Sequence, residues 1–236
     1  FSFIGDGLSH VAFGAMAIAS VLNFSNNMLF VMPVTVICAV LLLRTGQSTK
    51  IKGDAAIALI STTSLAVGVM VISLTTGMNT DVYNYMFGSI LAMSAEDVKL
   101  SLVLSVFVLI LFIVFYHKIF AITFDETFAR ATGVKAGVYN TLIAVLTAVT
   151  IVLGMRMMGA LLISSLIIFP ALTSMRVCRT FKSVIINAAI VSVVCLIAGV
   201  TLSYVAATPA GASVVLANLV MMVLYTVVGA VKNHMR

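Results

Sequence analysis

The chain has 236 residues, of which 62% are hydrophobic and only 8% are charged, and its mean hydropathy is +1.24. A soluble domain carries about a quarter charged residues, so this composition excludes a water-soluble globular protein. The apolar segments are long and nearly continuous, which excludes a membrane β-barrel with its alternating strands. We therefore expect an all-α, polytopic helical membrane protein.

Eight apolar segments are each near the length that crosses the hydrocarbon region of a bilayer. We expect them to form one transmembrane domain over residues 1–236. The first residue already adjoins an apolar segment and is not Met, so we expect the chain to lack a native N-terminal helix. The predicted membrane helices cover roughly residues 8–24, 28–43, 55–75, 97–116, 139–155, 158–175, 184–206 and 213–231.

The basic residues follow a topological pattern, because eleven of the thirteen lie in alternate connections and only Lys99 and Arg156 lie in the others. The positive-inside rule therefore predicts a cytoplasmic C-terminus. The net charge of +6 is accordingly a topology signal and does not indicate nucleic-acid binding, although contact with anionic membrane lipid is a secondary expectation.

The connection between the third and fourth predicted spans is more than a turn. Residues 81–93, "DVYNYMFGSILAM", are apolar enough for a short helix in the outer interface. Ser94 is expected to cap the next span, with Asp97 completing a capping box.

A second connection, "TFDETFARATG" over residues 123–133, predicts a compact cytoplasmic helix. Thr123 is the expected N-cap, Glu126 closes the capping box, and Gly133 suits the left-handed position that ends a helix. Phe124 and Phe128 share one face at a spacing of four residues. A capped amphipathic helix of this kind is expected to dock on another protein.

Asp6 and His10 stand four residues apart in "FIGDGLSHVAFG", on one face of the first predicted span. A carboxylate oxygen and an imidazole nitrogen suit a divalent ion such as zinc, manganese or iron, and a pair of ligands suits a transported ion that must leave again. The alternative is that Asp6 only caps the helix and that His10 only bonds a neighbouring helix.

The sequence carries no GxxxxGK[ST] phosphate loop, no HExxH zinc motif and no GxSxG elbow. With three histidines in the whole chain, a dense catalytic constellation is not available. We therefore expect no enzymatic activity in this chain.

Six segments, taken in order, resemble the permease subunits of zinc/manganese-type ABC metal importers, and the zinc branch more closely than the manganese branch. They run over nearly the whole chain: "FIGDGLSHVAFGAMAIA", "IKGDAAIALISTTSLAVGV", "NYMFGSILAMSAED", "AITFDETFARATGVKAG", "MGALLISSLIIFPALTSMR" and "TPAGASVVL". The resemblance implies a multi-pass protein of the bacterial plasma membrane. It also implies a permease homodimer, a cytoplasmic ATP-binding subunit that consumes the ATP, and an extracellular or periplasmic metal-binding protein.

The resemblance also implies roles for particular residues, without any tightly bound cofactor. Asp6 and His10 match the acid and histidine of the family's metal pathway, with zinc the favoured ion. Residues 124–134 match the helix that couples to the ATPase, through Phe124, Asp125, Glu126, Phe128, Ala129, Gly133 and Val134.

Three alternatives stay open. The same family resemblance allows manganese or iron as the transported ion. A metal chelate such as a siderophore or haem would need an aromatic-rich path, which a chain with no Trp and 8% aromatic residues disfavours. A carrier that works without an ATPase would be expected to show inverted repeats, and we find no convincing repeat.

Overall fold

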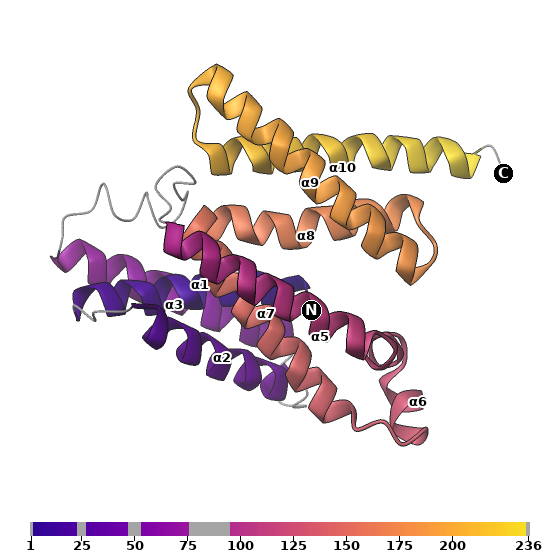
Figure 1. The fold of residues 1–236 in the computed structure, drawn as a ribbon, viewed down its shortest axis with the longest axis horizontal. Coiled ribbons are helices and arrows are strands. Elements are labelled where there is room, and N and C mark those ends of the chain that lie inside the picture. Colours follow the sequence, from indigo (N-terminus) through magenta and orange to yellow (C-terminus); the bar gives the residue numbers. More distant parts are fainter. Residues whose placement is uncertain (1, 23–26, 47–52, 76–94, 235–236) are drawn as a thin grey trace.

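The computed structural model describes residues 2–22, 27–46, 53–75 and 95–234, and within these ranges it contains helices and no strand (Figure 1). Each of the eight predicted membrane helices is present in these ranges, which confirms the all-α fold class. Within the described residues, seven helices are long and apolar enough to cross a membrane, and the apolar part of another covers 30–44. The helices are α1 (Ser2–Val21), α2 (Asn27–Gly46), α3 (Gly53–Thr75), α5 (Ala95–Phe124), α6 (Glu126–Ala131), α7 (Ala136–Met158), α8 (Ala160–Val177), α9 (Phe181–Ala206) and α10 (Ala210–His234).

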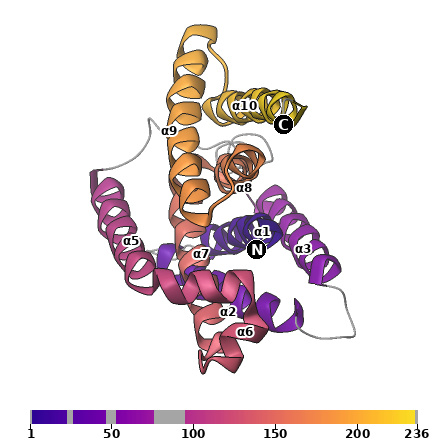
Figure 2. The same ribbon diagram turned by 90° about the vertical axis from the view of Figure 1, so that its right-hand side faces the viewer.

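The helix α5 lies at the periphery, where it packs mainly on α7 (Figure 2). It ends at Phe124 and so continues well past residue 116, where we predicted the end of this span. The extension holds because Ile119 and Ile122 are buried, while His117 and Lys118 are exposed. Its 30 residues correspond to a length of about 45 Å, which exceeds the roughly 30 Å of the hydrocarbon region.

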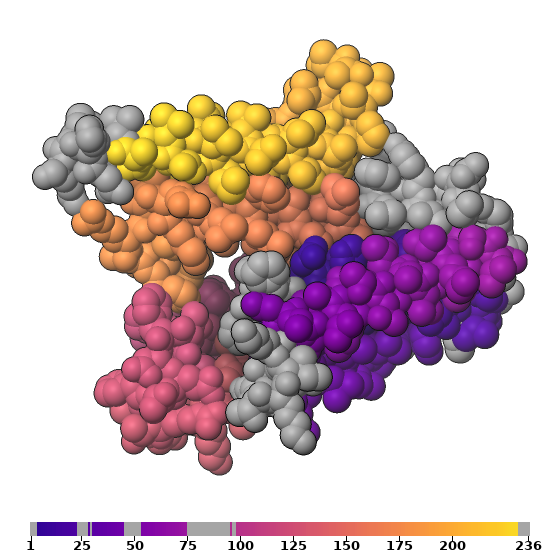
Figure 3. All heavy atoms as spheres, turned by 180° about the vertical axis from the view of Figure 1, so that it is seen from behind, coloured from indigo at the N-terminus to yellow at the C-terminus, as the bar shows by residue number. Residues whose placement is uncertain are grey.

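The remaining spans form two groups. The N-terminal group comprises α1, α2, α3 and α7, and the C-terminal group comprises α8, α9 and α10. The two groups meet where α1 and α7 contact α8. Seen from behind, the orange and yellow C-terminal group lies above the indigo and purple helices, and the lower end of its orange part touches the pink segment around α6 (Figure 3).

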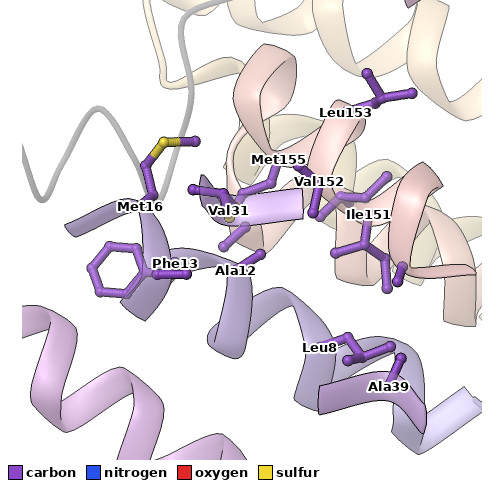
Figure 4. Packing of buried hydrophobic residues seen from close by; sticks show 14 of the residues in the cluster. Leu8, Ala12, Phe13, Met16, Val31, Ala39, Ile151, Val152, Leu153 and Met155 are labelled. Atoms are coloured by element: carbon purple, nitrogen blue, oxygen red, sulfur yellow. The ribbon is translucent and has the colours of Figure 1, made fainter. Parts of the chain in front are cut away.

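The core of the N-terminal group is built around α1, which packs against α2, α3, α7 and α8. Leu8, Ala12 and Phe13 of α1 are almost fully buried, together with Val31 of α2 and Ile151 of α7 (Figure 4). The many alanines and glycines of α1 allow its neighbours to approach closely, as small residues do in membrane helix packing.

A hydrogen-bonded chain joins the three helices of the C-terminal group. The amide nitrogen of Asn187 donates to Ser174 Oγ at 3.0 Å, and the hydroxyl of Tyr225 donates to Asn187 Oδ1 at 3.4 Å. These contacts cross α8, α9 and α10 and pair side chains that a bilayer would otherwise leave unsatisfied.

The predicted cap of the cytoplasmic helix is wrong by two residues. Thr123 lies inside α5, where its hydroxyl donates to the Ile119 carbonyl at 2.7 Å. Asp125 is the N-cap of α6, and its carboxylate accepts from the Phe128 amide at 2.9 Å. The error follows from the length of α5, whose last turn takes up the threonine that we assigned to the connection.

The interfacial helix predicted at residues 81–93 and Ser94, the expected cap of the next span, lie outside the described residues. Of the two prolines inside the described membrane helices, Pro170 of α8 is buried in the bundle and Pro33 of α2 is exposed.

Candidate functional site

Asp6 and His10 lie on one face of α1, one turn apart. Their side chains are 43% and 23% exposed, and Asp6 Oδ1 lies 3.9 Å from His10 Nε2, which is beyond hydrogen-bond distance. Because α1 already begins at Ser2, Asp6 is inside the helix and is not its N-cap. The capping interpretation of Asp6 is therefore wrong.

The pair lies beside α8, level with the middle of that helix. Gly5, next to Asp6, packs so closely on α8 that a Cβ atom there would lie 3.2 Å from Ile167 Cγ2. Ile167 is near the middle of α8, so the Asp6–His10 turn is level with the middle of that membrane helix. Ionisable groups at such a depth are costly unless they serve an ion pathway.

The spacing of the two side chains fits metal coordination. Zinc–oxygen and zinc–nitrogen bonds of about 2.05 Å at the tetrahedral angle separate the two ligand atoms by about 3.4 Å. The 3.9 Å between Asp6 Oδ1 and His10 Nε2 is larger by a distance that a small side-chain rotation closes. The arrangement can thus offer two ligands to one ion.

The described residues do not complete a metal-binding site within one chain. They contain no group of three or more His, Cys, Asp or Glu side chains placed to hold a metal ion. His10 Nδ1 is buried and has no hydrogen-bond partner in the part of the chain that the structure describes. A histidine that binds metal through one nitrogen usually donates the other to an acceptor, so such an acceptor must come from elsewhere.

Ser9, between Asp6 and His10 in the sequence, is fully buried and faces α8. Its Oγ lies 2.7 Å from the Asp6 carbonyl and 2.8 Å from Ser164 Oγ. Sequence reasoning did not single out Ser9, whose partner Ser164 lies on α8. The structure shows a packing contact between α1 and α8 at this point.

The helix α6 is held by a small hydrophobic cluster of its own. Ala129 is fully buried and packs with Ile122 of α5 and Ala136 of α7. Val134 packs against the same cluster. Of the seven residues expected to couple, these two therefore face inward and anchor the segment.

The other five residues of the coupling prediction lie on the outside or at the ends of α6. Phe124 and Phe128 are 66% and 65% exposed. Asp125 is the N-cap, Glu126 pairs with Arg130, and Gly133 takes a left-handed conformation with a φ of 85°. Phe124 is the last residue of α5 and Phe128 lies in α6, so the prediction that the two rings share one helical face is wrong. Each ring is exposed, and exposed apolar groups of this kind suit a protein partner.

The exposed rings of α5 also contact the start of α9. Phe181 lies 5.1 Å from Phe120 and 5.8 Å from Phe124, measured between ring centroids. Because α9 belongs to the C-terminal group, this aromatic contact links the end of α5 that leads into α6 directly to that group.

An apolar cavity of about 320 Å³ lies between α5, α7 and α8. Val108 and Phe112 line it, and so do Thr147 and Thr150, whose hydroxyls donate to carbonyls of their own helix at 2.8 Å. The other lining residues are apolar, and the cavity holds no carboxylate, imidazole or thiol that would mark it as a metal site.

The chain is similar to known metal-transport membrane proteins over most of its length. A model of the ABC 3 transport family matches residues 1–229. The "High-affinity zinc uptake system membrane protein ZnuB" of Haemophilus influenzae is 31% identical over 223 residues, covering 94% of this chain and 85% of the relative. The "Manganese transport system membrane protein MntC" of Halalkalibacterium halodurans is 29% identical over 217 residues, covering 91% of this chain and 73% of the relative.

A solved structure has the same fold. The structure titled "PsaBC from Streptococcus pneumoniae in complex with Fab" contains a chain that superposes with a TM-score of 0.83 at 26% identity, covering 95% of this chain and 80% of that one.

Proposed function

Because the chain belongs to the ABC 3 transport family, we propose that it is the permease subunit of an ATP-driven importer of divalent transition metal ions, most favourably zinc. Like its relatives, it is a membrane subunit of a transport system and not an enzyme. ATP is hydrolysed by a separate cytoplasmic subunit, and an extracellular or periplasmic protein delivers the ion.

The observation that carries this proposal is the Asp6–His10 pair. Its ligand atoms lie 3.9 Å apart, level with the middle of α8. Two ligands hold an ion briefly and release it, which suits transport. A permease homodimer supplies a second pair across its axis, and four ligands match the coordination number that zinc prefers.

Manganese is the second candidate ion, and it is supported by the manganese-transport relatives. Carboxylate oxygen suits manganese well, whereas imidazole suits zinc better. One carboxylate and one imidazole therefore favour zinc over manganese by a small margin. Competition between the two ions for uptake identifies the transported ion.

The energy for transport enters through α6. We place the ATPase contact on Phe124 and Phe128, with Asp125, Glu126 and Gly133 shaping the helix and Ala129 and Val134 anchoring it. ATP binding and hydrolysis in the partner then shift the segment and move the spans between outward-open and inward-open states. This arrangement places α6 and the C-terminus in the cytoplasm.

The test is uptake of radioactive zinc into proteoliposomes that hold the full-length permease, its ATPase and its binding protein. Wild type should accumulate zinc only with ATP. Asp6→Ala and His10→Ala should abolish uptake, because each leaves one protein ligand per subunit. His117→Ala is the matched control. His117 is exposed near the C-terminal end of α5, so this variant should transport zinc normally.

The competing interpretations give different outcomes in the same assay. Strong inhibition by manganese would identify a manganese importer. Inhibition by a metal chelate but not by free zinc would identify a chelate importer. Uptake by the purified chain under an ion gradient without ATP would identify a carrier. Normal zinc uptake by both the Asp6 and the His10 variants would remove the pair from the pathway.

A further inference from the structure

The contact between Ser9 and Ser164 joins the helix that carries the proposed metal ligands to the C-terminal group. Ser9 is flanked by Asp6 one turn before it and by His10 directly after it. Ser9 Oγ and Ser164 Oγ lie 2.8 Å apart, and Gly5 packs on Ile167 one turn away along the interface between α1 and α8, which we call the seam. Both contacts lie at the level of the proposed ligands.

The two serines make more hydrogen-bond contacts than their two hydroxyl protons can serve. Ser9 Oγ lies 2.7 Å from the Asp6 carbonyl, and Ser164 Oγ lies 3.0 Å from the Ala160 carbonyl. Together with the contact between the two serines, that makes three hydrogen bonds to be filled by two hydroxyl protons. The bond between the helices therefore forms only when one serine releases the carbonyl of its own helix.

This arrangement makes the seam inexpensive to open. A polar group left unpaired inside a membrane bundle carries a free-energy penalty. If α1 and α8 separate, each serine can turn its proton to its own helix carbonyl, so neither hydroxyl proton is left unpaired. If one of the two partners had no carbonyl of its own helix within reach, separating the helices would leave that partner without a hydrogen bond.

We propose that Ser9 and Ser164 are a pair of positioning residues that fix the Asp6–His10 turn against α8 in one state of the transport cycle and release it in the other. This inference rests on the proposed transport function. Neither serine is assigned to bind the ion; they act through the position of α1.

Cross-linking tests whether the seam opens. The double variant Ser9→Cys with Ser164→Cys, in a background without Cys38, Cys178 and Cys195, should form a disulfide under mild oxidation, because the two hydroxyl oxygens are already 2.8 Å apart. The matched control is Ser9→Cys with Ser165→Cys, since Ser165 Oγ bonds the Leu162 carbonyl within α8 and should not cross-link.

We expect the cross-linked protein to lose ATP-driven uptake and to regain it on reduction. The rate of cross-linking should also fall while the ATPase turns over, because the seam then spends less time closed. Failure to cross-link, full uptake by the cross-linked protein, or a rate indifferent to ATP would each overturn the proposal. The cross-linking rate does not depend on which ion is carried, so it stays informative even if metal uptake fails in wild type.

Alanine variants provide a second test. Ser9→Ala and Ser164→Ala should each raise the metal concentration for half-maximal uptake, but by less than the about fivefold expected for one ordinary hydrogen bond, because the remaining serine can bond the carbonyl of its own helix instead. The double variant should equal either single variant, because both remove the same bond. Ser164→Thr keeps the hydroxyl and should restore the wild-type value, while Ser165→Ala should leave it unchanged. Effects that add in the double variant would contradict a shared bond.

Discussion

Gly14 marks the closest approach of α1 and α3. A Cβ atom at this position would lie 2.7 Å from the Ser64 carbonyl oxygen and 3.3 Å from its carbon. Backbone atoms cannot move aside as the end of a flexible side chain can. The contact therefore depends on the absence of a side chain at Gly14.

We expect Gly14→Ala to lower the free energy of unfolding by about 1–3 kcal/mol, the usual range for overpacking a tight core. Denaturant titration of the protein in detergent would measure the change. Gly137→Ala is the control, because nothing lies within 4 Å of a Cβ there, and this variant should be neutral or slightly more stable. Equal stability of the two variants would show that α1 and α3 can shift apart at little cost.

At the residue scale, the features that depend on helical periodicity were predictable from the sequence. The spacing of four placed Asp6 and His10 on one face, and the structure shows that face. The partner of Ser9 was not predictable, because Ser164 is 155 residues away and their contact depends on the register between two helices. The capping interpretation of Asp6 failed because α1 starts earlier than the apolar pattern suggested.

Among the elements, α6 lends itself to the sharpest test because its inward and outward faces are distinct. Phe128 is 65% exposed and Ala129 is fully buried. Phe128→Ala should leave the fold unchanged but weaken binding of the ATPase by about tenfold or more, since exposed aromatic anchors dominate many interfaces. Thr127→Ala, also exposed on α6, should bind normally.

The measurement is co-purification of the ATPase with each permease variant, followed by its affinity in detergent or nanodiscs. Circular dichroism and size-exclusion profiles of the free permease would confirm that the Phe128 variant is folded. If Phe128→Ala binds as well as Thr127→Ala, the docking surface lies elsewhere on the cytoplasmic face.

Element lengths were less predictable than element number. The eight predicted spans correspond to helices, because each apolar run is close to the bilayer thickness. The end of α5 was placed too early because "HKIFAITF" looks polar at its start, whereas Ile119 and Ile122 are buried, Ile122 in the small cluster under α6. Local composition did not reveal a contact with residues of α7 that come later in the chain.

For the molecule as a whole, the proposed orientation in the membrane rests on the arrangement of charge. Lys118, Lys135 and Arg176 are exposed at the helix ends that adjoin α6 or lie on the same side as it, whereas Ala206 ends α9 on the other side. Under the proposed topology the first three face the cytoplasm and Ala206 faces outward.

Single cysteines in a background without native cysteine test that orientation. A membrane-impermeant thiol reagent should label Ala206→Cys in intact cells, and it should label Lys135→Cys only after the membrane is opened. The reverse pattern would invert the topology and place α6 beyond the reach of a cytoplasmic ATPase.

The shape of α5 has a mechanical consequence. The part of this helix that leads into α6 runs across the direction of the earlier part (Figure 2), and through Phe120 and Phe124 it contacts Phe181 at the first turn of α9. Because of this bend, a movement of α6 is not passed straight along the axis of α5. It acts at an angle to the earlier part of the helix, and the first turn of α9 is in contact with the segment that moves.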